Sequence, residues 1–413
     1  MNCGSTVVIN SNDTGAGSLR DTILHACDGA TITFDLTPGR VANPINLTSG
    51  ELLMNKNVII QGPNANVLTV QRSAASGTPS FSIFNNPTGL SLSLSGLTLS
   101  NADNPNNGGA IKNAGTLSLN SMALTNNHTA VAGSALFNAE TGNATIANST
   151  FSNNNSDQFA AIYNQGGALN LTNSTLTANA NASNFPGAAI FSESFAGVTN
   201  ITNCTIALNT GQAEVVWRNG SSGALINLKN TIVSGNTGGD VNGTTDLGNN
   251  LIGGNALLAA LGNYGGPTQT MALLPGSPAI NAGTATGAPT TDQRGISRVG
   301  TVDIGAFESR GFTITATSGT PQSAIITVTF AAPLLATVTG VGSEPVAGGA
   351  ITFTAPATGP SASLSGGVTV FNTVINASGQ ASTPAIANAI AGGPIQRDRH
   401  QCGRNSGFVQ PDQ

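Results

Sequence analysis

Acidic side chains are the first candidates for chemistry in this chain. Hydrolysis of a glycosidic bond uses two carboxyl groups about 5–9 Å apart. In a stack of repeated units, such a pair requires acids at the same position of neighbouring repeats. The acids of residues 89–246 do not recur in this way; they include Asp103, Glu140, Asp157, Glu193, Glu214 and Asp240. The sequence therefore assigns no catalytic residue, no metal ligand and no cofactor, and His128 is expected to be an isolated, solvated turn residue.

Aromatic side chains do recur at one position, which indicates binding rather than catalysis. Each follows the last hydrophobic residue of a repeated phrase, so strand alternation points it outward if that hydrophobic residue points inward. Lys112 and Asn242 at the ends of this column favour the outward direction. An exposed aromatic stripe would suit the flat faces of sugar rings. Alternatively, a loop or a neighbouring chain covers the stripe, or the column points inward. The column consists of Phe137, Tyr163, Phe191 and Trp217.

Two repeated phrases define the period that positions these side chains. One phrase, such as Leu119–Asn127, starts at residues 94, 119, 146, 171, 201 and 228, and the other ends at 111, 136, 162, 190, 216 and 241. Both advance by 25–30 residues without a helix-length amphipathic stretch, which excludes leucine-rich, ankyrin and tetratricopeptide repeats. Short alternating strands that share a core only when stacked predict a parallel β-helix. Its turns should carry a hydrogen-bonded asparagine ladder: Asn127, Asn154, Asn179, Asn209 and Asn236.

The composition agrees with turn-rich β structure and excludes several classes of protein. Of the 413 residues, 8 % are charged and 52 are glycine, and the net charge is −5. The few scattered cations make no basic face, so no nucleic-acid partner is expected. No apolar run reaches about 18 residues, so no transmembrane segment is expected either. The oligomeric state is left open.

Short motifs of the repeat resemble a family of bacterial surface proteins. Gly108–Ile111 (GGAI) and Phe151–Asn154 (FSNN) are similar to the GGAI and FxxN repeats of polymorphic outer-membrane proteins. That resemblance implies a right-handed parallel β-helix with the pectin-lyase-like fold and an association with adhesion.

The segment before the repeat predicts a helical cap. Ser18 can cap a short helix in which Asp21 occupies the third position. Helical spacing places Leu19, Ile23, Leu24 and Cys27 toward the core, and Arg20 is expected to pair with Asp21. Ser18-Leu19-Arg20 is similar to the core of the CSLREA-type region at the N-terminus of secreted bacterial β-helix proteins.

After the repeat, four motifs in order resemble the choice-of-anchor segment of exported bacterial β-helix proteins. This resemblance implies export and surface display. The charged residues Asp292, Arg294, Asp303 and Glu308 are expected to hold a cap together by ion pairs and hydrogen bonds. The motifs are Leu261–Thr268, Ser277–Gly283, Asp292–Gly295 and Asp303–Glu308.

Beyond Gly311 the pattern changes to alternating stretches separated by turns, which favours a β-sandwich. The stretches are Phe312–Thr315, Ile325–Val328, Leu335–Val338, Ile351–Thr354, Ser361–Leu364 and Val368–Phe371. Glu344–Val346 and Thr352–Pro356 resemble bacterial immunoglobulin-like domains of the invasin type, which implies a stalk module. The last residues, 395–413, form an atypical tail, interpreted either as a basic segment for a partner or, preferentially, as a frameshifted end that leaves a sandwich edge exposed.

The predicted organisation has five parts. They are an N-terminal cap with the first coils (1–88), β-helix repeats (89–246), a C-terminal cap or anchor-type segment (247–310), an immunoglobulin-like domain (311–394) and the atypical tail (395–413). The predicted fold class is thus all-β, a right-handed parallel β-helix with a helical cap followed by a sandwich.

Cysteine usage bears on the cellular compartment. Cys3, Cys27, Cys204 and Cys402 match no zinc pattern. Unpaired thiols are the default expectation, and a pair between Cys3 and Cys27 is the alternative if the protein is exported. No signal peptide is visible after Met1, so either the protein is cytosolic or its true start lies upstream. Low charge favours the second interpretation and an extracellular or outer cell-surface location.

These observations predict a surface-displayed or secreted protein with an adhesive or scaffolding role. The expected partner is a polysaccharide or a cell-surface glycan, bound through the aromatic stripe. The alternative is a polysaccharide lyase or glycoside hydrolase of the pectate-lyase-like β-helix type.

Overall fold

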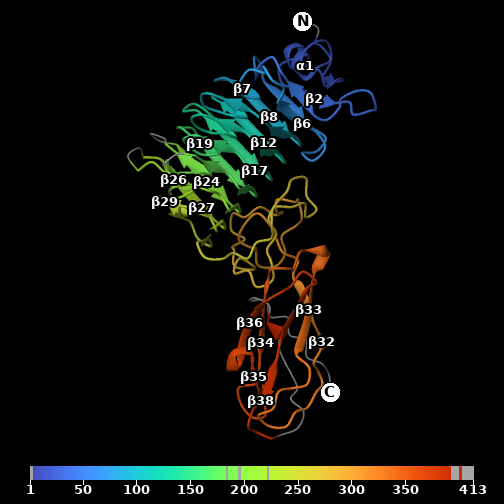
Figure 1. The fold of residues 1–413 in the computed structure, drawn as a ribbon. Coiled ribbons are helices and arrows are strands. Elements are labelled where there is room, and N and C mark those ends of the chain that lie inside the picture. Colours follow the sequence, from blue (N-terminus) through green and yellow to red (C-terminus); the bar gives the residue numbers. More distant parts are fainter. Residues whose placement is uncertain (1–2, 183–184, 194–196, 221–222, 392–399, 402–413) are drawn as a thin grey trace.

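The computed structural model describes residues 3–182, 185–193, 197–220, 223–391 and 400–401. The described chain is almost all-β, with one short α-helix, α1 (Leu19–His25), at the N-terminal end. A solenoid of stacked coils occupies the N-terminal part, and small antiparallel sheets lie at the other end of the molecule (Figure 1).

Three long parallel sheets form the solenoid, together with a fourth, short one. Each coil visits them in turn, so that strands 25–30 residues apart lie side by side as a right-handed parallel β-helix of about eight turns. We call the long sheets the first, second and third faces.

The first face contains β1 (Val7–Val8), β2 (Ala30–Phe34), β5 (Val58–Gln61), β8 (Ser91–Ser95), β12 (Thr116–Asn120), β16 (Asn143–Ala147), β20 (Leu169–Thr172), β24 (Val198–Thr202), β27 (Leu225–Lys229) and β30 (Thr245–Asp246). The second face contains β3 (Ile45–Leu47), β6 (Thr69–Arg72), β9 (Thr98–Ser100), β13 (Ala123–Thr125), β17 (Thr150–Ser152), β21 (Thr175–Thr177), β25 (Thr205–Ala207), β28 (Ile232–Ser234) and β31 (Leu251–Ile252). The third face contains β4 (Leu52–Leu53), β7 (Phe84–Asn86), β11 (Ile111–Asn113), β15 (Leu136–Asn138), β19 (Ile162–Asn164), β23 (Ile190–Ser192), β26 (Val216–Arg218) and β29 (Val241–Asn242). The short sheet, between the second and third faces along the chain, contains β10 (Asp103–Asn104), β14 (His128–Thr129), β18 (Asn155–Ser156) and β22 (Ala180–Asn181).

Columns of aliphatic side chains fill the interior. On the first face, strand register places one inward residue of each coil directly on the next, and every one of them is buried. This column is Leu119, Ile146, Leu171, Ile201 and Leu228. Because each coil offers only a few apolar residues, stacking is what removes them from water.

The predicted asparagine ladder is confirmed. Each side-chain amide donates to the carbonyl oxygen of the next one at 2.9–3.0 Å, from Asn127 to Asn236. The left-handed turn residue is the one before it, such as Asn126 or Asn153. A second ladder, which the sequence interpretation missed, ends the third-face strands at Asn86, Asn113, Asn138 and Asn164.

The N-terminal helix closes the first coil as predicted, with three differences in detail. Ser18 Oγ accepts the N–H of Asp21, and Leu19 and Ile23 join the solenoid core. Leu24 and Cys27, however, are exposed: Leu24 lies on the outer side of the helix, and Cys27 follows the end of the helix at His25.

The expected pair between Arg20 and Asp21 is also wrong. Arg20 reaches across to Asp13 at 2.8 Å, while Asp21 accepts the N–H of Gly17 and lies 3.0 Å from His25. Asp13 therefore pairs with a residue of the helix, and Asp21 contacts the residue before the N-cap and the last residue of the helix.

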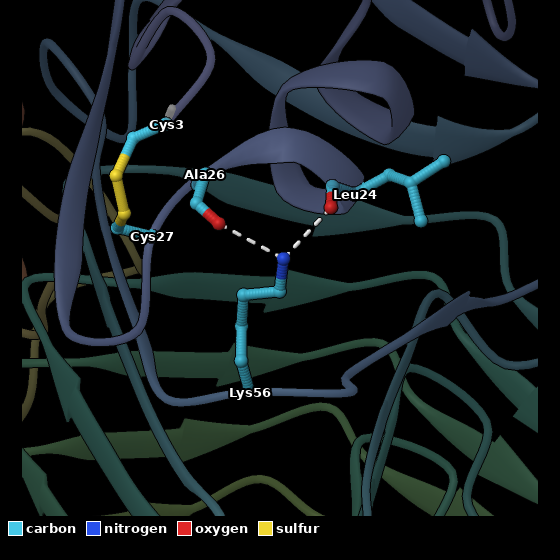
Figure 2. Close-up of a disulfide and its surroundings, with 5 residues drawn as sticks. All are labelled: Cys3, Leu24, Ala26, Cys27 and Lys56. Carbon is cyan, nitrogen blue, oxygen red and sulfur yellow. Dashed lines mark hydrogen bonds between the residues drawn. A yellow bond between two sulfur atoms is a disulfide. The ribbon is translucent and has the colours of Figure 1, made fainter. Parts of the chain in front are cut away.

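A disulfide joins Cys3 to Cys27, which replaces the default expectation of free thiols. Their Cα atoms lie 5.2 Å apart. Lys56 donates to the carbonyl oxygens of Leu24 and Ala26 and so holds the end of the same helix (Figure 2). The N-terminal segment is thereby fixed to the first coils by a covalent and a polar contact.

Residues 247–310 pack along the outside of the second face rather than only across its end. Thr175 Oγ1 contacts Gln293 at 2.6 Å, and the N–H of Ala306 donates to Thr205 Oγ1 at 3.1 Å. Thr175 and Thr205, the first residues of β21 and β25, point outward and are buried by this segment. This lateral cover explains why threonine recurs there.

Three small antiparallel sheets follow, around a core that includes Phe330, Val338 and Phe353. They contain β32 (Phe312–Ser318), β33 (Leu334–Gly340) and β37 (Gln380–Thr383); β36 (Val370–Val374), β34 (Ala350–Thr354) and β39 (His400–Gln401); and β35 (Ala362–Leu364) with β38 (Ala385–Ala387). Two 3₁₀ turns are η1 (Val341–Ser343) and η2 (Ser365–Gly367). An immunoglobulin-like topology stays a prediction.

Two details concern the expectations for this end of the chain. The stretch Ile325–Val328 is a turn instead of a strand, with Thr327 in the left-handed region at φ 63°. Except for 400–401, whose backbone pairs with β34, the predicted tail 395–413 lies outside the described residues.

Candidate functional site

The aromatic column is real, and its members stack in register across four strands. Phe137, Tyr163, Phe191 and Trp217 are successive partners on β15, β19, β23 and β26. The rings of Phe137 and Tyr163 are 5.5 Å apart and those of Tyr163 and Phe191 are 5.2 Å apart, both nearly parallel. They form a cluster separate from the solenoid core, because they point outward.

The expectation that this stripe is exposed is wrong. Only 9 % of Phe137, 5 % of Tyr163 and 4 % of Phe191 is accessible, and Trp217 is half-buried. The turn before β19 folds back over the rings, so that Phe159 packs 4.8 Å from Phe191 and 5.7 Å from Tyr163.

Sequence position explains how the cover was missed. Phe159 stands three residues before the inward anchor, where Gly108, Gly133 and Gly187 stand in neighbouring repeats. Those glycines approach the outward column closely; a Cβ on Gly187 would lie 2.9 Å from Phe191 Cβ. The aromatic residue at this position was therefore an indication that the turn covers the stripe.

Tyr163 is further fixed by a carboxylate. Its hydroxyl donates to Glu193 Oε2. Burial, and then the Glu193 carboxylate, raise the pKa of Tyr163 well above its usual value. The hydroxyl therefore stays protonated and acts as a hydrogen-bond donor within the fold.

A surface hollow of about 290 Å³ opens at the N-terminal end of the column. It lies beside Phe137 and Lys112, between the third face and the turn that carries Asn106. Lys112 Nζ is 3.6 Å from Glu51 Oε2, and Asn85 Nδ2 donates to Glu51 Oε1 at 2.8 Å. Side-chain amides and the Lys112 ammonium thus line the hollow beside Phe137, and the Glu51 carboxylate contacts both Lys112 and Asn85.

His128 is not the isolated residue that the sequence suggested. Its Nδ1 lies 2.8 Å from Asp103 Oδ1, and its Nε2 lies 3.1 Å from Asp157 Oδ1. Asp103 and His128 are partners in the short sheet, and Asp157 follows β18 of the next coil. The sequence pattern compared acids only with acids, so it did not reveal this contact with a histidine.

The electrostatics of His128, Asp103 and Asp157 indicate that these side chains hold neighbouring coils together. Burial alone would lower the pKa of His128, but the hydrogen bonds and charges of Asp103 and Asp157 outweigh it and raise the pKa. The hydrogen bond from Ser80, followed by that from His128, holds the pKa of Asp103 below its usual value. Both ring nitrogens contact carboxylates, so the imidazole links three successive coils.

The expected ion pairs of the 247–310 segment are present and buried. Arg294 lies 2.7 Å from Asp292 and 3.5 Å above the ring of Phe307, and Arg298 lies 2.8 Å from Glu308. Burial, and then the charge of Glu308, raise the pKa of Asp303 to about 7.

The same cluster reaches into the antiparallel sheets. Glu344 accepts the hydroxyl of Ser309 and the N–H of Arg310 at 3.0 Å each, and lies 3.7 Å from Arg294. Burial raises the pKa of Glu344. These charges join two parts of the chain and are not accessible to a ligand.

Among the described residues, no group of three histidine, cysteine or acidic side chains is arranged to hold a metal ion. The same residues contain no helix of the length and apolarity needed to cross a membrane. No protein-family model, curated protein or solved structure matches the chain.

Proposed function

We propose that this protein is an extracellular or surface-displayed β-helix with an adhesive and scaffolding role. The observation that carries the proposal is the disulfide between Cys3 and Cys27. Disulfides form and persist in oxidising compartments, which are extracellular or on the export route.

The architecture supports a role in presenting a surface. The solenoid buries its apolar residues in continuous columns and carries few charges, which gives a long, stiff body. The buried Glu344–Arg294 contact fixes the C-terminal sheets to it. We interpret these sheets as an immunoglobulin-like stalk module and residues 247–310 as an anchor-type segment, in accordance with the motifs they carry.

Intact-cell labelling tests display. Cells that make the protein naturally would be treated with a membrane-impermeant amine reagent, and the labelled lysines would be identified by mass spectrometry. We expect labelling of the half-buried Lys112 and Lys229 at the level seen with the purified protein. Labelling that appears only after lysis would contradict a surface location.

Bead adhesion tests the adhesive role. Beads coated with the purified full chain should bind to a polysaccharide-bearing cell surface more than beads coated with an unrelated protein of equal charge. Equal retention of both would contradict adhesion and leave scaffolding alone. Release of soluble sugar from the surface would instead favour the polysaccharide-cleaving alternative.

A further inference from the structure

The hollow beside Lys112 has the size of a small binding site. Its volume, about 290 Å³, falls just below the range for ligand pockets, about 300–1,000 Å³. It is open on one side, and the aromatic stack begins at its wall with Phe137. A site of this size accommodates one ring of a longer molecule that continues into solvent.

Its lining combines an apolar surface with neutral amides. Phe137, Ala114 and Ala139 supply the apolar part, while Asn85 and Asn106 supply side-chain amides. In binding sites of this kind, the few polar groups fix the orientation of the ligand and the apolar lining contributes most of the affinity. A sugar ring matches this pattern because it has an apolar C–H face and hydroxyl groups at its edge.

The charges at the hollow favour a neutral ligand. The Lys112 ammonium is partly compensated by Glu51 at 3.6 Å, so neither an anion nor a cation finds an unopposed counter-charge. Hydroxyl groups both donate and accept hydrogen bonds, and the Asn106 amide and the Lys112 ammonium in the lining offer both kinds of partner.

Hydrogen bonds hold the backbone of the turn at the wall of the hollow. Gly108 has φ +76°, and a Cβ there would lie 2.5 Å from Lys112 Cγ, so only glycine lets the turn pack on this side chain. The N–H of Asn106 donates to the buried Asn104 at 2.9 Å, and Thr129 donates to the Asn106 carbonyl. Preorganised contacts of this kind lower the entropy lost on binding.

We propose that the hollow between Lys112, Asn106 and Phe137 binds a single ring of a neutral polysaccharide. The inference rests on the proposed adhesive function and names its ligand class. It moves the expected glycan contact from the covered stripe to the hollow beside the first member of that column, Phe137.

Affinity electrophoresis tests it with the purified full chain. Native gels would contain dextran, galactomannan, xyloglucan or, as the acidic comparison, polygalacturonate. Ala114→Leu fills the hollow, and Asn106→Ala removes an exposed amide. The matched controls are Ala75→Leu and Asn155→Ala, which change exposed residues outside the hollow.

We expect retardation in at least one neutral gel. Ala114→Leu should abolish it, and Asn106→Ala should weaken binding about tenfold, the effect of one lost hydrogen bond. Both controls should migrate like the original protein. Because the Asn106 side chain is exposed, this variant keeps the test valid if Ala114→Leu folds poorly.

Four results would overturn the inference. Retardation only by polygalacturonate would replace the neutral ligand with an acidic one. Retardation unchanged by both hollow variants would place the site elsewhere and leave adhesion intact. Absence of retardation in every gel would remove the glycan, and the bead assay would then decide the adhesive role independently. Clearing of the polymer would indicate an enzyme.

Discussion

Substituting Asn154 with alanine should destabilise the solenoid more than any change on its surface. Asn154 is fully buried, and its Oδ1 accepts the N–H and the Nδ2 of Asn127 at 3.2 and 2.9 Å. Its Nδ2 donates to Leu124 O at 2.9 Å and to Asn179 Oδ1 at 3.0 Å. One side chain therefore satisfies groups of the two neighbouring coils.

The magnitude follows from the partners that alanine would leave behind. Each buried polar group without a partner costs about 1–3 kcal/mol, and hydrogen bonds of one network are not additive. After local relaxation, we expect a loss of about 3–5 kcal/mol in the free energy of unfolding. That is a large share of the ~5–15 kcal/mol that stabilises an ordinary protein.

Urea unfolding followed by far-UV circular dichroism measures this loss. The matched control is Asn155→Ala, one residue later and exposed, which should change stability by less than ~0.5 kcal/mol. Asn154→Asp keeps the size and the acceptor but removes both donors, so it should also destabilise. A loss below ~1 kcal/mol for Asn154→Ala, or equal losses for Asn154→Ala and Asn155→Ala, would refute the ladder as a source of stability.

Three further changes test other contacts. Joint replacement of Cys3 and Cys27 by serine should lower the stability of the N-terminal coils by about 3.5 kcal/mol, the loop-entropy estimate for a separation of 24 residues; hydrogen exchange that stays unchanged there would contradict this. The folded protein keeps the Asp303 proton up to about pH 7, whereas the unfolded chain releases it near pH 4. The free energy of unfolding should therefore fall by at most about 4 kcal/mol as the pH rises from 4 to 7. Asp303→Asn should flatten this fall in urea titrations at several pH values, and an unaltered slope would exclude Asp303 as its source. Glu344→Gln leaves Arg294 without its second carboxylate and should speed proteolysis between the 247–310 segment and the antiparallel sheets several-fold, whereas an unchanged cleavage rate would show that this contact does not hold them together.

The solenoid could be predicted because its period is written into local sequence. The stacked Leu119, Ile146 and Leu171 and the ladder asparagines obey one spacing, so inward and turn positions follow from alternation alone. The third-face ladder, which includes Asn86 and Asn113, has the same spacing. The asparagine that recurs two residues after the end of the second phrase could have predicted it.

The surface could not be predicted in the same way. Whether Tyr163 is covered depends on the turn that carries Phe159, and alternation says nothing about the direction of a turn. Asp103 and His128 share one repeat position, but a search for recurring acids does not pair an acid with a histidine, and Asp157 lies two residues beyond that position in the next coil. The hollow beside Lys112 likewise requires the three-dimensional course of the turn before it.

The redox state of the N-terminal cysteines in protein isolated from its natural cells tests the proposed extracellular role most directly. Cells would be lysed in the presence of an alkylating agent, and the cysteine peptides would be identified by mass spectrometry. We predict that Cys3 and Cys27 are recovered as one disulfide-linked peptide pair. The buried Cys204, whose pKa burial raises to about 12, should be alkylated only after unfolding. Recovery of Cys3 and Cys27 as separately alkylated thiols would place the protein in a reducing compartment and contradict the account.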